Sequence, residues 1–240
     1  MRIFLAGATG AVGRRVALLL REAGHDVTGT TRAAGKIQQL NALGVTPAVV
    51  DVFDANALMQ AVVTARPEIV IHQLTDLSSA PGTPGYPAAQ EANRRIRIDG
   101  TRNLMRAARE AGARRAIAQS IAFIYPPGEV LRSEDDPLDL AAEGVRQSTV
   151  QGIVELERQV LTTDGIEGVV LRYGYLYGPD TWYDQPPKPP SVHVDAAAHA
   201  AILAVGKGGG VYNIAEECGI VSSAKAKREL GFDPAFRMGR

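Results

Sequence analysis

The feature that most constrains this chain is a glycine-rich junction near its start, between an apolar strand-like run and a helical run. Residues 3–6 are apolar throughout, residues 12, 16, 19 and 23 are apolar at helical spacing, and glycine stands between the two runs. A helix N-terminus in such a unit offers unpaired amides and partial positive charge, which stabilise a bound diphosphate. The spacing predicts a phosphate cradle made of Gly7, Thr9, Gly10, Ala11, Val12 and Gly13.

Apolar runs of strand length then alternate with helical stretches through the first two-thirds of the chain. We predict strands over residues 3–6, 27–31, 48–50, 69–73, 116–120 and 169–172, and later helices over 88–111, 143–161, 196–205 and 223–230. Strands without polar alternation are typical of a parallel sheet that is covered on both faces. The order therefore predicts an α/β protein with a doubly wound parallel sheet, the Rossmann fold.

The pattern weakens after residue 172. The segment 179–190 contains five prolines, which remove hydrogen-bond donors and oppose regular structure. We expect a dinucleotide-binding Rossmann core over residues 1–178. The remainder, residues 179–240, is expected to be a small, shortened substrate-side lobe rather than an independent domain.

Charge and cysteine content exclude several classes of protein. Basic and acidic residues are equal in number, 26 of each, so the chain lacks the cationic excess that nucleic-acid binding needs. A single cysteine, Cys218, cannot form an internal disulfide, which favours a reducing cytoplasm. No apolar run approaches the roughly 18 residues of a membrane span. We expect a cytoplasmic protein with no nucleic-acid partner, no membrane association and no bound metal.

Several segments resemble one known family in order along nearly the whole chain. They read "GATGAVGR", "NRRIRIDGTRNLMRAAREAGARRAIAQSIAFIY", "VVLRYGYLYGPD", "SVHVDAAAHAA", "VYNIAEE" and "SSAKAKRELGFDPAFR". The chain is similar to the extended short-chain dehydrogenases/reductases, the NAD-dependent epimerase/dehydratase family. The resemblance implies a nicotinamide cofactor, a small-molecule substrate, and a homodimer formed through the helices at 88–111 and 143–161. The segments after "YGP" and "YNIAEE" are shorter than the family pattern.

The end of the second predicted strand bears on the choice of cofactor. NAD-binding proteins usually carry Asp or Glu there for the ribose 2′-hydroxyl, but this chain has Thr30, Thr31 and Arg32. The planar guanidinium of Arg32 suits a 2′-phosphate, and Lys36 adds a second cation. We favour NADP, with NAD as the alternative, and include Thr31 among the cofactor contacts.

The resemblance implies further cofactor contacts at strand ends and in the later helices. Asp51 matches the family's adenine-binding Asp. The remaining positions implied in this way are Val52, Gln73, Leu74, Thr75, Asn93, Ser120 and Tyr173.

The family's proton-donating pair is missing. Family members use a Tyr and, four residues later, a Lys that lowers the Tyr pKa. With Glu157 as the anchor of the alignment, Thr149 takes the Tyr position and Ile153 the Lys position, and neither Tyr nor Lys occurs anywhere in residues 126–172. The family's Ser or Thr falls on Ile121. Ser120 and Tyr125 are the weak catalytic candidates that remain.

Other polar and aromatic residues have ordinary explanations. The family's helix Asn falls near Arg97, and Asn93, one turn earlier, is a possible replacement. We expect His72 to be a hydrogen-bonded core histidine, His193 and Asp195 to be structural, and His199 to lie on the surface. A group of aromatic residues follows the last predicted strand, and it would suit a flat, possibly aromatic substrate: Tyr173, Tyr175, Tyr177, Trp182 and Tyr183.

Three functions stay open at this point. The first is an atypical NAD(P)-dependent oxidoreductase that transfers hydride to or from a small molecule without the Tyr/Lys pair, for example a quinone-like or conjugated acceptor. The second is a non-catalytic NADP-binding sensor or regulatory protein. The third is a structural protein with a relic pocket, which would bind no nucleotide.

Overall fold

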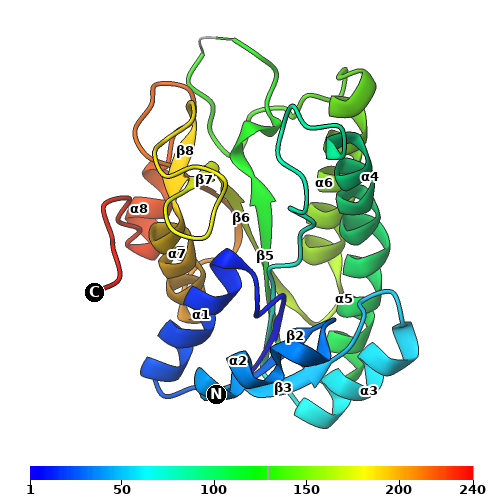
Figure 1. Ribbon diagram of the computed structural model, residues 1–240. Coiled ribbons are helices and arrows are strands. Elements are labelled where there is room, and N and C mark those ends of the chain that lie inside the picture. Colours follow the sequence, from blue (N-terminus) through cyan, green and yellow to red (C-terminus); the bar gives the residue numbers. More distant parts are fainter. Residues whose placement is uncertain (129, 240) are drawn as a thin grey trace.

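The computed structural model describes residues 1–128 and 130–239. Its main element is a parallel sheet with the strand order β3-β2-β1-β4-β5-β6-β9 (Figure 1). These strands are β1 (Arg2–Ala6), β2 (Asp26–Thr31), β3 (Thr46–Val49), β4 (Ile69–His72), β5 (Arg115–Ile121), β6 (Glu167–Tyr173) and β9 (Gly210–Ile214). This is the predicted doubly wound arrangement, with the reversal of strand order between β1 and β4.

Helices cover both faces of the sheet, so that alternate residues of a strand are buried on opposite sides. Ile3 and Leu5 of β1 belong to one hydrophobic cluster, and Phe4 to the other. Figure 1 shows α1 and α7 on one side of β5 and β6, and α4, α5 and α6 on the other. The α-helices are α1 (Ala11–Glu22), α2 (Ile37–Ala42), α3 (Ala55–Ala65), α4 (Tyr86–Arg95), α5 (Thr101–Glu110), α6 (Gly144–Thr162), α7 (Val194–Gly206) and α8 (Ala224–Leu230).

The helix predicted over 88–111 contains a π-helical turn. Helices α4 and α5 are joined by η2 (Ile96–Gly100), which has π-helical geometry. A Cβ atom at Gly100 would lie 3.1 Å from a methyl group of Val52, so glycine permits close packing against the segment after β3. Such turns are frequent at functional sites, and this one projects Ile96 and Arg97 toward the carboxyl ends of the strands.

The predicted division at residue 178 does not coincide with a division of the sheet. Strand β9 lies within residues 179–240 and pairs with β6, and α7 shares the hydrophobic cluster of α1. The sequence patterns also missed α2, α3, β9 and β7 (Tyr175–Tyr177), which pairs in parallel with β8 (Ser191–His193). Segments this short carry too little periodicity to be distinguished from loops. The segment 179–190 forms no helix or strand, as its prolines predict.

Candidate functional site

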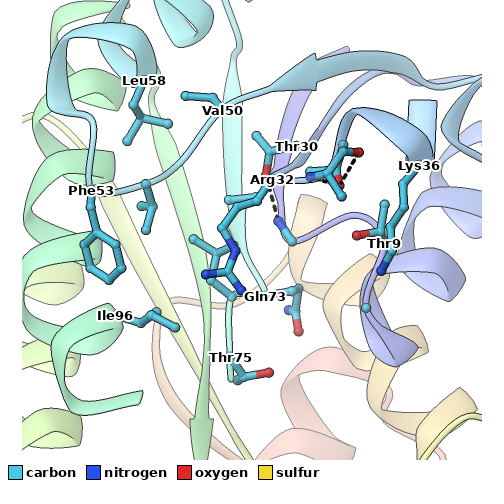
Figure 2. Close-up of a pocket in the computed structure, with 17 residues that line it drawn as sticks. Thr9, Thr30, Arg32, Lys36, Val50, Phe53, Leu58, Gln73, Thr75 and Ile96 are labelled. Carbon is cyan, nitrogen blue, oxygen red and sulfur yellow. Dashed lines mark hydrogen bonds between the residues drawn. The ribbon is translucent and has the colours of Figure 1, made fainter. Parts of the chain in front are cut away.

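A cavity of about 560 Å³ opens at the carboxyl ends of β1, β2 and β4, where the strand order reverses (Figure 2). Its lining contains two basic side chains, Arg32 and Lys36, and no acidic one. The lining residues are Ala6, Gly7, Thr9, Gly10, Thr30, Thr31, Arg32, Ala33, Lys36, Val50, Val52, Phe53, Leu58, Gln73, Leu74, Thr75 and Ile96. Such a switch point is where open α/β sheets bind nucleotides.

The three glycines of the phosphate cradle do different work. Gly7 has φ +87°, and a Cβ there would lie 2.7 Å from the carbonyl oxygen of Gln73. A Cβ at Gly13 would lie 2.0 Å from the carbonyl oxygen of Gly7. Both positions therefore need glycine for the fold itself. Gly10 is exposed, and the nearest atom to its Cβ position is the Gly7 carbonyl oxygen at 3.5 Å, so nothing in the fold requires glycine there.

The first turn of α1 has no internal partner for its amides. Gly10 is the N-cap with no side-chain hydrogen bond, and no acidic residue occupies the first turn. Within the described part of the chain, no acceptor is recorded for the amides of Ala11, Val12 and Gly13, whereas the Arg14 amide bonds the Gly10 carbonyl at 3.0 Å. Three free amides beside an exposed glycine fit the diphosphate of a dinucleotide.

The end of β2 supplies the cationic side of the cavity. Thr30 Oγ1 accepts a hydrogen bond from the Gly7 amide at 3.0 Å, and Thr31 Oγ1 accepts one from the Ala33 amide at 3.2 Å. These bonds fix the turn from which Arg32 and Lys36 emerge. Figure 2 shows the Arg32 side chain crossing the middle of the cavity, while Lys36 lies beside Thr9.

An apolar wall faces these cations. Figure 2 shows Val50, Phe53, Leu58 and Ile96 together on the side of the cavity away from Lys36. Sequence reasoning missed all four as site residues, because each also fits a core pattern. The predicted adenine contact Asp51 is not among the lining residues, since its carboxylate accepts the Phe53 amide at 2.9 Å. Its neighbour Val52 does line the cavity.

The segment after β4 closes the third side. Gln73, Leu74 and Thr75 line the cavity, and the Gln73 Oε1 atom is buried without a hydrogen-bond partner. Asn93 holds this segment in place, because its amide group donates to the Asp76 carbonyl at 2.6 Å and accepts the Asp76 amide at 2.8 Å. The predicted contact Asn93 is therefore occupied by the protein's own backbone.

The two catalytic candidates lie in a buried network outside the cavity lining. Ser120 Oγ donates to Glu157 Oε1 at 2.6 Å, and Arg172 donates to both oxygens of Glu157, at 2.9 and 2.7 Å. The Tyr125 hydroxyl donates to Asn213 at 2.8 Å and accepts from Arg172 at 2.7 Å. Every one of these hydroxyl groups already has protein partners.

The buried surroundings do not prepare the phenols for proton transfer at neutral pH. Burial raises the pKa of Tyr125, although Arg172 opposes the shift. Burial also raises the pKa of Tyr173, whose hydroxyl accepts a 3.4 Å bond from Gln73. At the family's Tyr and Lys positions, the Thr149 hydroxyl bonds Gln90 at 3.1 Å, and Ile153 is fully buried.

His72 has the structural role that the sequence predicts. Its Nδ1 accepts the Leu74 amide at 3.2 Å, so the neutral ring carries its proton on Nε2, which lies 3.0 Å from the Thr101 hydroxyl. Burial and the charge of Arg97 lower the pKa of His72 to about 4. The expectation for His199 is different from the structure, because its ring is half-buried and stacks on Phe236 at 3.9 Å. Asp195 is structural as expected and accepts a bond from Arg15 at 2.6 Å.

This shift makes stability depend on pH. Between pH 6.5 and about 4 the unfolded chain binds a proton at His72 that the folded protein excludes, so stability falls as the pH is lowered through this range. We expect His72 to account for a loss of roughly 3 kcal/mol. Urea unfolding at a series of pH values should show a shallower slope of the unfolding free energy against pH for His72→Gln than for the wild type. Equal slopes would contradict the assignment.

The aromatic residues after β6 do not form one patch. Tyr173 is in the core, and Tyr177 packs edge-on against His193 and donates to Glu216 at 2.6 Å. Tyr175 instead stacks on Phe123 with ring centroids 4.0 Å apart. Only part of the predicted group therefore gathers at one place.

In the part of the chain that the structure describes, no helix is long and apolar enough to span a membrane.

Known proteins share both the sequence and the fold. A protein from Streptomyces sp., named 3-diazoavenalumate denitrifying reductase, is 40% identical over 226 residues, which cover 85% of this chain and 72% of that protein. The UDP-glucose 4-epimerase of Thermotoga maritima, solved with UDP-glucose, has a TM-score of 0.77 at 19% identity and covers 99% of this chain and 94% of its own.

A second epimerase structure repeats this likeness. The UDP-glucose 4-epimerase of Thermus thermophilus, in complex with NAD, has a TM-score of 0.78 at 18% identity and covers 99% and 95% of the two chains. The family model described as the NAD dependent epimerase/dehydratase family matches residues 3–232. The chain therefore belongs to the NAD-dependent epimerase/dehydratase family and is an oxidoreductase of that family.

Proposed function

We propose that this protein is an NADP-dependent reductase whose acceptor takes a hydride without a proton from the enzyme, and that the acceptor carries an arenediazonium group. The observation that carries the proposal is the replacement of the family's proton-donating pair by Thr149 and Ile153. The remaining hydroxyl candidates, Ser120 and Tyr125, are held in the buried network. The name of the Streptomyces relative, a denitrifying reductase of a diazo compound, supports the choice of acceptor.

The stoichiometry explains why the donor is dispensable. Carbonyl reduction adds one hydride and one proton, so a family member with a carbonyl substrate needs a donor beside the oxygen. Reductive removal of a diazonium group breaks the C–N bond, whose electron pair leaves with N2, and the hydride brings the pair for the new C–H bond. No proton enters the balance. When bound, NADPH supplies that hydride and is oxidised by two electrons.

The chain's own residues would hold the cofactor in the cavity. The amides of Ala11, Val12 and Gly13 suit the diphosphate, the apolar wall suits a flat base, and Gln73 Oε1 can accept a hydrogen bond. Arg32 and Lys36, in a lining without acidic groups, favour a 2′-phosphate over a free 2′-hydroxyl. These features support NADP, and NAD is the alternative.

Reversing the charge at the end of β2 should reverse the preference. We expect Arg32→Asp to weaken NADPH binding by roughly 100-fold, because it replaces a charge-assisted bond with repulsion. NADH binding should be retained or improved. Titration followed through the sole tryptophan, Trp182, measures both affinities. Arg109→Asp, on the exposed side of α5, is the matched control, and selectivity for NADPH in Arg32→Asp would refute this role.

Isotope labelling gives the sharpest test of the function. With an arenediazonium salt, 4-carboxybenzenediazonium, and NADPH deuterated at the transferred position, we expect deuterium at the vacated ring carbon and release of N2. With unlabelled NADPH in D2O, the product should carry no deuterium at that carbon. The Gly10→Asp variant measures the uncatalysed background.

The alternatives predict other outcomes. Deuterium taken from D2O, or a rate no higher than that of Gly10→Asp, would overturn the reductase proposal. Tight NADPH binding without turnover would favour the sensor, and no nucleotide binding would favour the structural protein. Two further properties stay predictions. Sedimentation can test the homodimer through α4, α5 and α6, and fractionation can test the cytoplasmic location.

A further inference from the structure

Arg97 is a buried cation for which the described residues supply no hydrogen-bond partner. It belongs to the π-helical turn η2 and is only 9% exposed. Its Nη1 atom is fully buried and has no hydrogen-bond partner, and no ion pair to Arg97 is recorded within residues 1–128 and 130–239. An uncompensated charge in the interior is strongly unfavourable, so proteins rarely retain one without a use for it.

The other buried arginines of the chain show how it normally satisfies such groups. Arg172 is held by both oxygens of Glu157 and by Tyr125. Arg115 bonds Glu167 and the carbonyl oxygens of Ala204, Lys207 and Gly208. Arg97 is the exception within the described residues, which indicates that its partner comes from outside the chain.

Among the described residues, no carboxylate is recorded as a partner of Arg97. Burial lowers the pKa of Arg97 to about 10, and the phenol of Tyr86 opposes the shift. Its guanidinium is still protonated at neutral pH. The neighbouring His72 is neutral, as shown above. On the other side, Gly152 of α6 gives the side chain room, because a Cβ there would lie 3.3 Å from Arg97 Cδ.

Aromatic rings gather near this cation, above the carboxyl ends of β4, β5 and β6. Phe123, after β5, stacks on Tyr175, after β6, at 4.0 Å and an interplanar angle of 5°. Lys188 lies 4.9 Å over the Tyr175 ring. Burial raises the pKa of Tyr86, with smaller contributions from Tyr175 and Tyr183 that place these phenols nearby. The cluster combines flat apolar faces with cations, which suits a planar anion.

We propose that Arg97 binds an anionic oxygen, a carboxylate or a phenolate, of a flat aromatic substrate that packs among Tyr86, Phe123 and Tyr175. The proposal deepens the reductase function proposed above and rests on it for the word substrate. Arg97 follows the cavity-lining residue Ile96 in η2, and this place on a helical turn gives the anion a fixed anchor. The name of the Streptomyces relative contains a compound, 3-diazoavenalumate, whose ending is that of a carboxylate, and this agrees with an anionic substrate.

Binding of simple probes tests the anchor without any turnover. We use calorimetry on the NADP⁺-saturated protein with benzoate and cinnamate, with their neutral amides, and with 4-nitrophenolate. Arg97→Met should lower the affinity for the anionic probe that binds by roughly 30-fold or more, as expected for the loss of a charge-assisted hydrogen bond. The neutral amides should bind weakly to both proteins. Arg97→Lys should restore part of the affinity, and Arg106→Met, exposed on α5, should change nothing.

Stability gives a second measurement that distinguishes an anchor from a structural residue. Because Arg97→Met removes an unpaired buried charge, we expect the ligand-free variant to melt at a higher temperature than the wild type. Its NADP⁺ affinity should stay within about threefold of the wild type, since the cradle is untouched. A lower melting temperature, equal binding of the anions by the variant, or a parallel loss of NADP⁺ affinity would each overturn the proposal.

The probes also separate the two sources of charge and the two proposals. Arg97-dependent binding of cinnamate or benzoate identifies a carboxylate, and Arg97-dependent binding of 4-nitrophenolate alone identifies a phenolate; either result supports the anchor. If the anions bind through Arg97 but no diazonium salt is reduced, the reductase proposal fails while the anchor stands. If reduction occurs at the same rate in Arg97→Met and the anions do not bind, the anchor fails while the function stands.

Discussion

Substitution of Gly10 by Asp should abolish dinucleotide binding and leave the fold intact. Gly10 is the N-cap of α1, with φ −77° and ψ 171°, a conformation in which Asp is a favoured cap. Its Cβ would meet only the Gly7 carbonyl oxygen, at 3.5 Å. The new carboxylate would accept hydrogen bonds from the amides that we expect to bind the diphosphate, and its negative charge would repel the diphosphate. We expect NADPH affinity to fall by at least about 100-fold, while the free energy of unfolding changes by no more than about 0.5 kcal/mol.

Two control variants separate charge, bulk and fold. Gly10→Asn has nearly the same size without the charge, so it should retain more affinity than Gly10→Asp. Gly13→Ala places a Cβ 2.0 Å from the Gly7 carbonyl oxygen and should destabilise the fold by about 3 kcal/mol. Calorimetric titration and urea unfolding measure the two effects. NADPH binding of wild-type strength by Gly10→Asp would mean that the nucleotide does not use the N-terminus of α1.

Glu157→Gln should be the most destabilising single change in the buried network. The carboxylate of Glu157 accepts two bonds from Arg172 and one from Ser120, and the side chains of the ion pair are 5% and 7% exposed. Burial disfavours the charged form of Arg172, yet the bonds to Glu157 raise its pKa overall. A glutamine amide would face guanidinium donors and leave their charge unpaired. We expect a loss of roughly 3–5 kcal/mol, or about 10 °C in Tm.

The matched control replaces both members of the pair. Glu157→Met combined with Arg172→Met removes the two charges together, so it should recover much of the stability that Glu157→Gln loses. Urea unfolding of the three proteins measures the difference. A Glu157→Gln variant as stable as the wild type would show that solvent or another group compensates the charge of Arg172. The ion pair would then not be what stabilises the buried network.

This network also explains how the family's catalytic position changed its use. In the resemblance, Ser120 comes directly before the family's Ser or Thr position and Glu157 lies eight residues after its Tyr position, but here they join Arg172 and Tyr125 in a closed set of hydrogen bonds. A hydroxyl that donates to a buried carboxylate or amide is not available to a substrate. Under the proposed function, such a site can still support the reduction of an acceptor that needs only hydride.

Much of the cofactor site could be predicted because its signals are local. Gly7, Gly10 and Gly13 specify a turn whose backbone geometry needs glycine at two positions and leaves the third open. Arg32 and Lys36 follow the end of β2 within one turn of the chain, so their place on the cavity follows from strand direction alone. His72 lies inside an apolar strand, which is sufficient to predict its burial.

Other residues could not be assigned because their roles depend on packing between distant segments. Phe53, Leu58 and Ile96 look like core residues in the sequence, and only their convergence makes the apolar wall. Asp51 matches the family pattern, yet it is not among the residues that line the cavity, and its carboxylate accepts a bond from the Phe53 amide. Arg97 belongs to an arginine-rich run that the sequence predicts as the solvated side of a helix, but it is buried, and nothing in a sequence shows that a buried charge lacks a partner.

The sequence by itself determined most of the alternation of strands and helices, and it predicted the phosphate cradle and the loss of the family's Tyr/Lys pair, since apolar periodicity, glycine conformation and residue identity are properties of the local chain. Only the tertiary structure decided which polar groups are satisfied. Hydrogen-bond satisfaction depends on atoms many residues apart: Ser120 and Glu157 are 37 positions apart, and Tyr125 and Asn213 are 88. The same packing that joins these groups leaves Arg97 without a hydrogen-bond partner among the described residues.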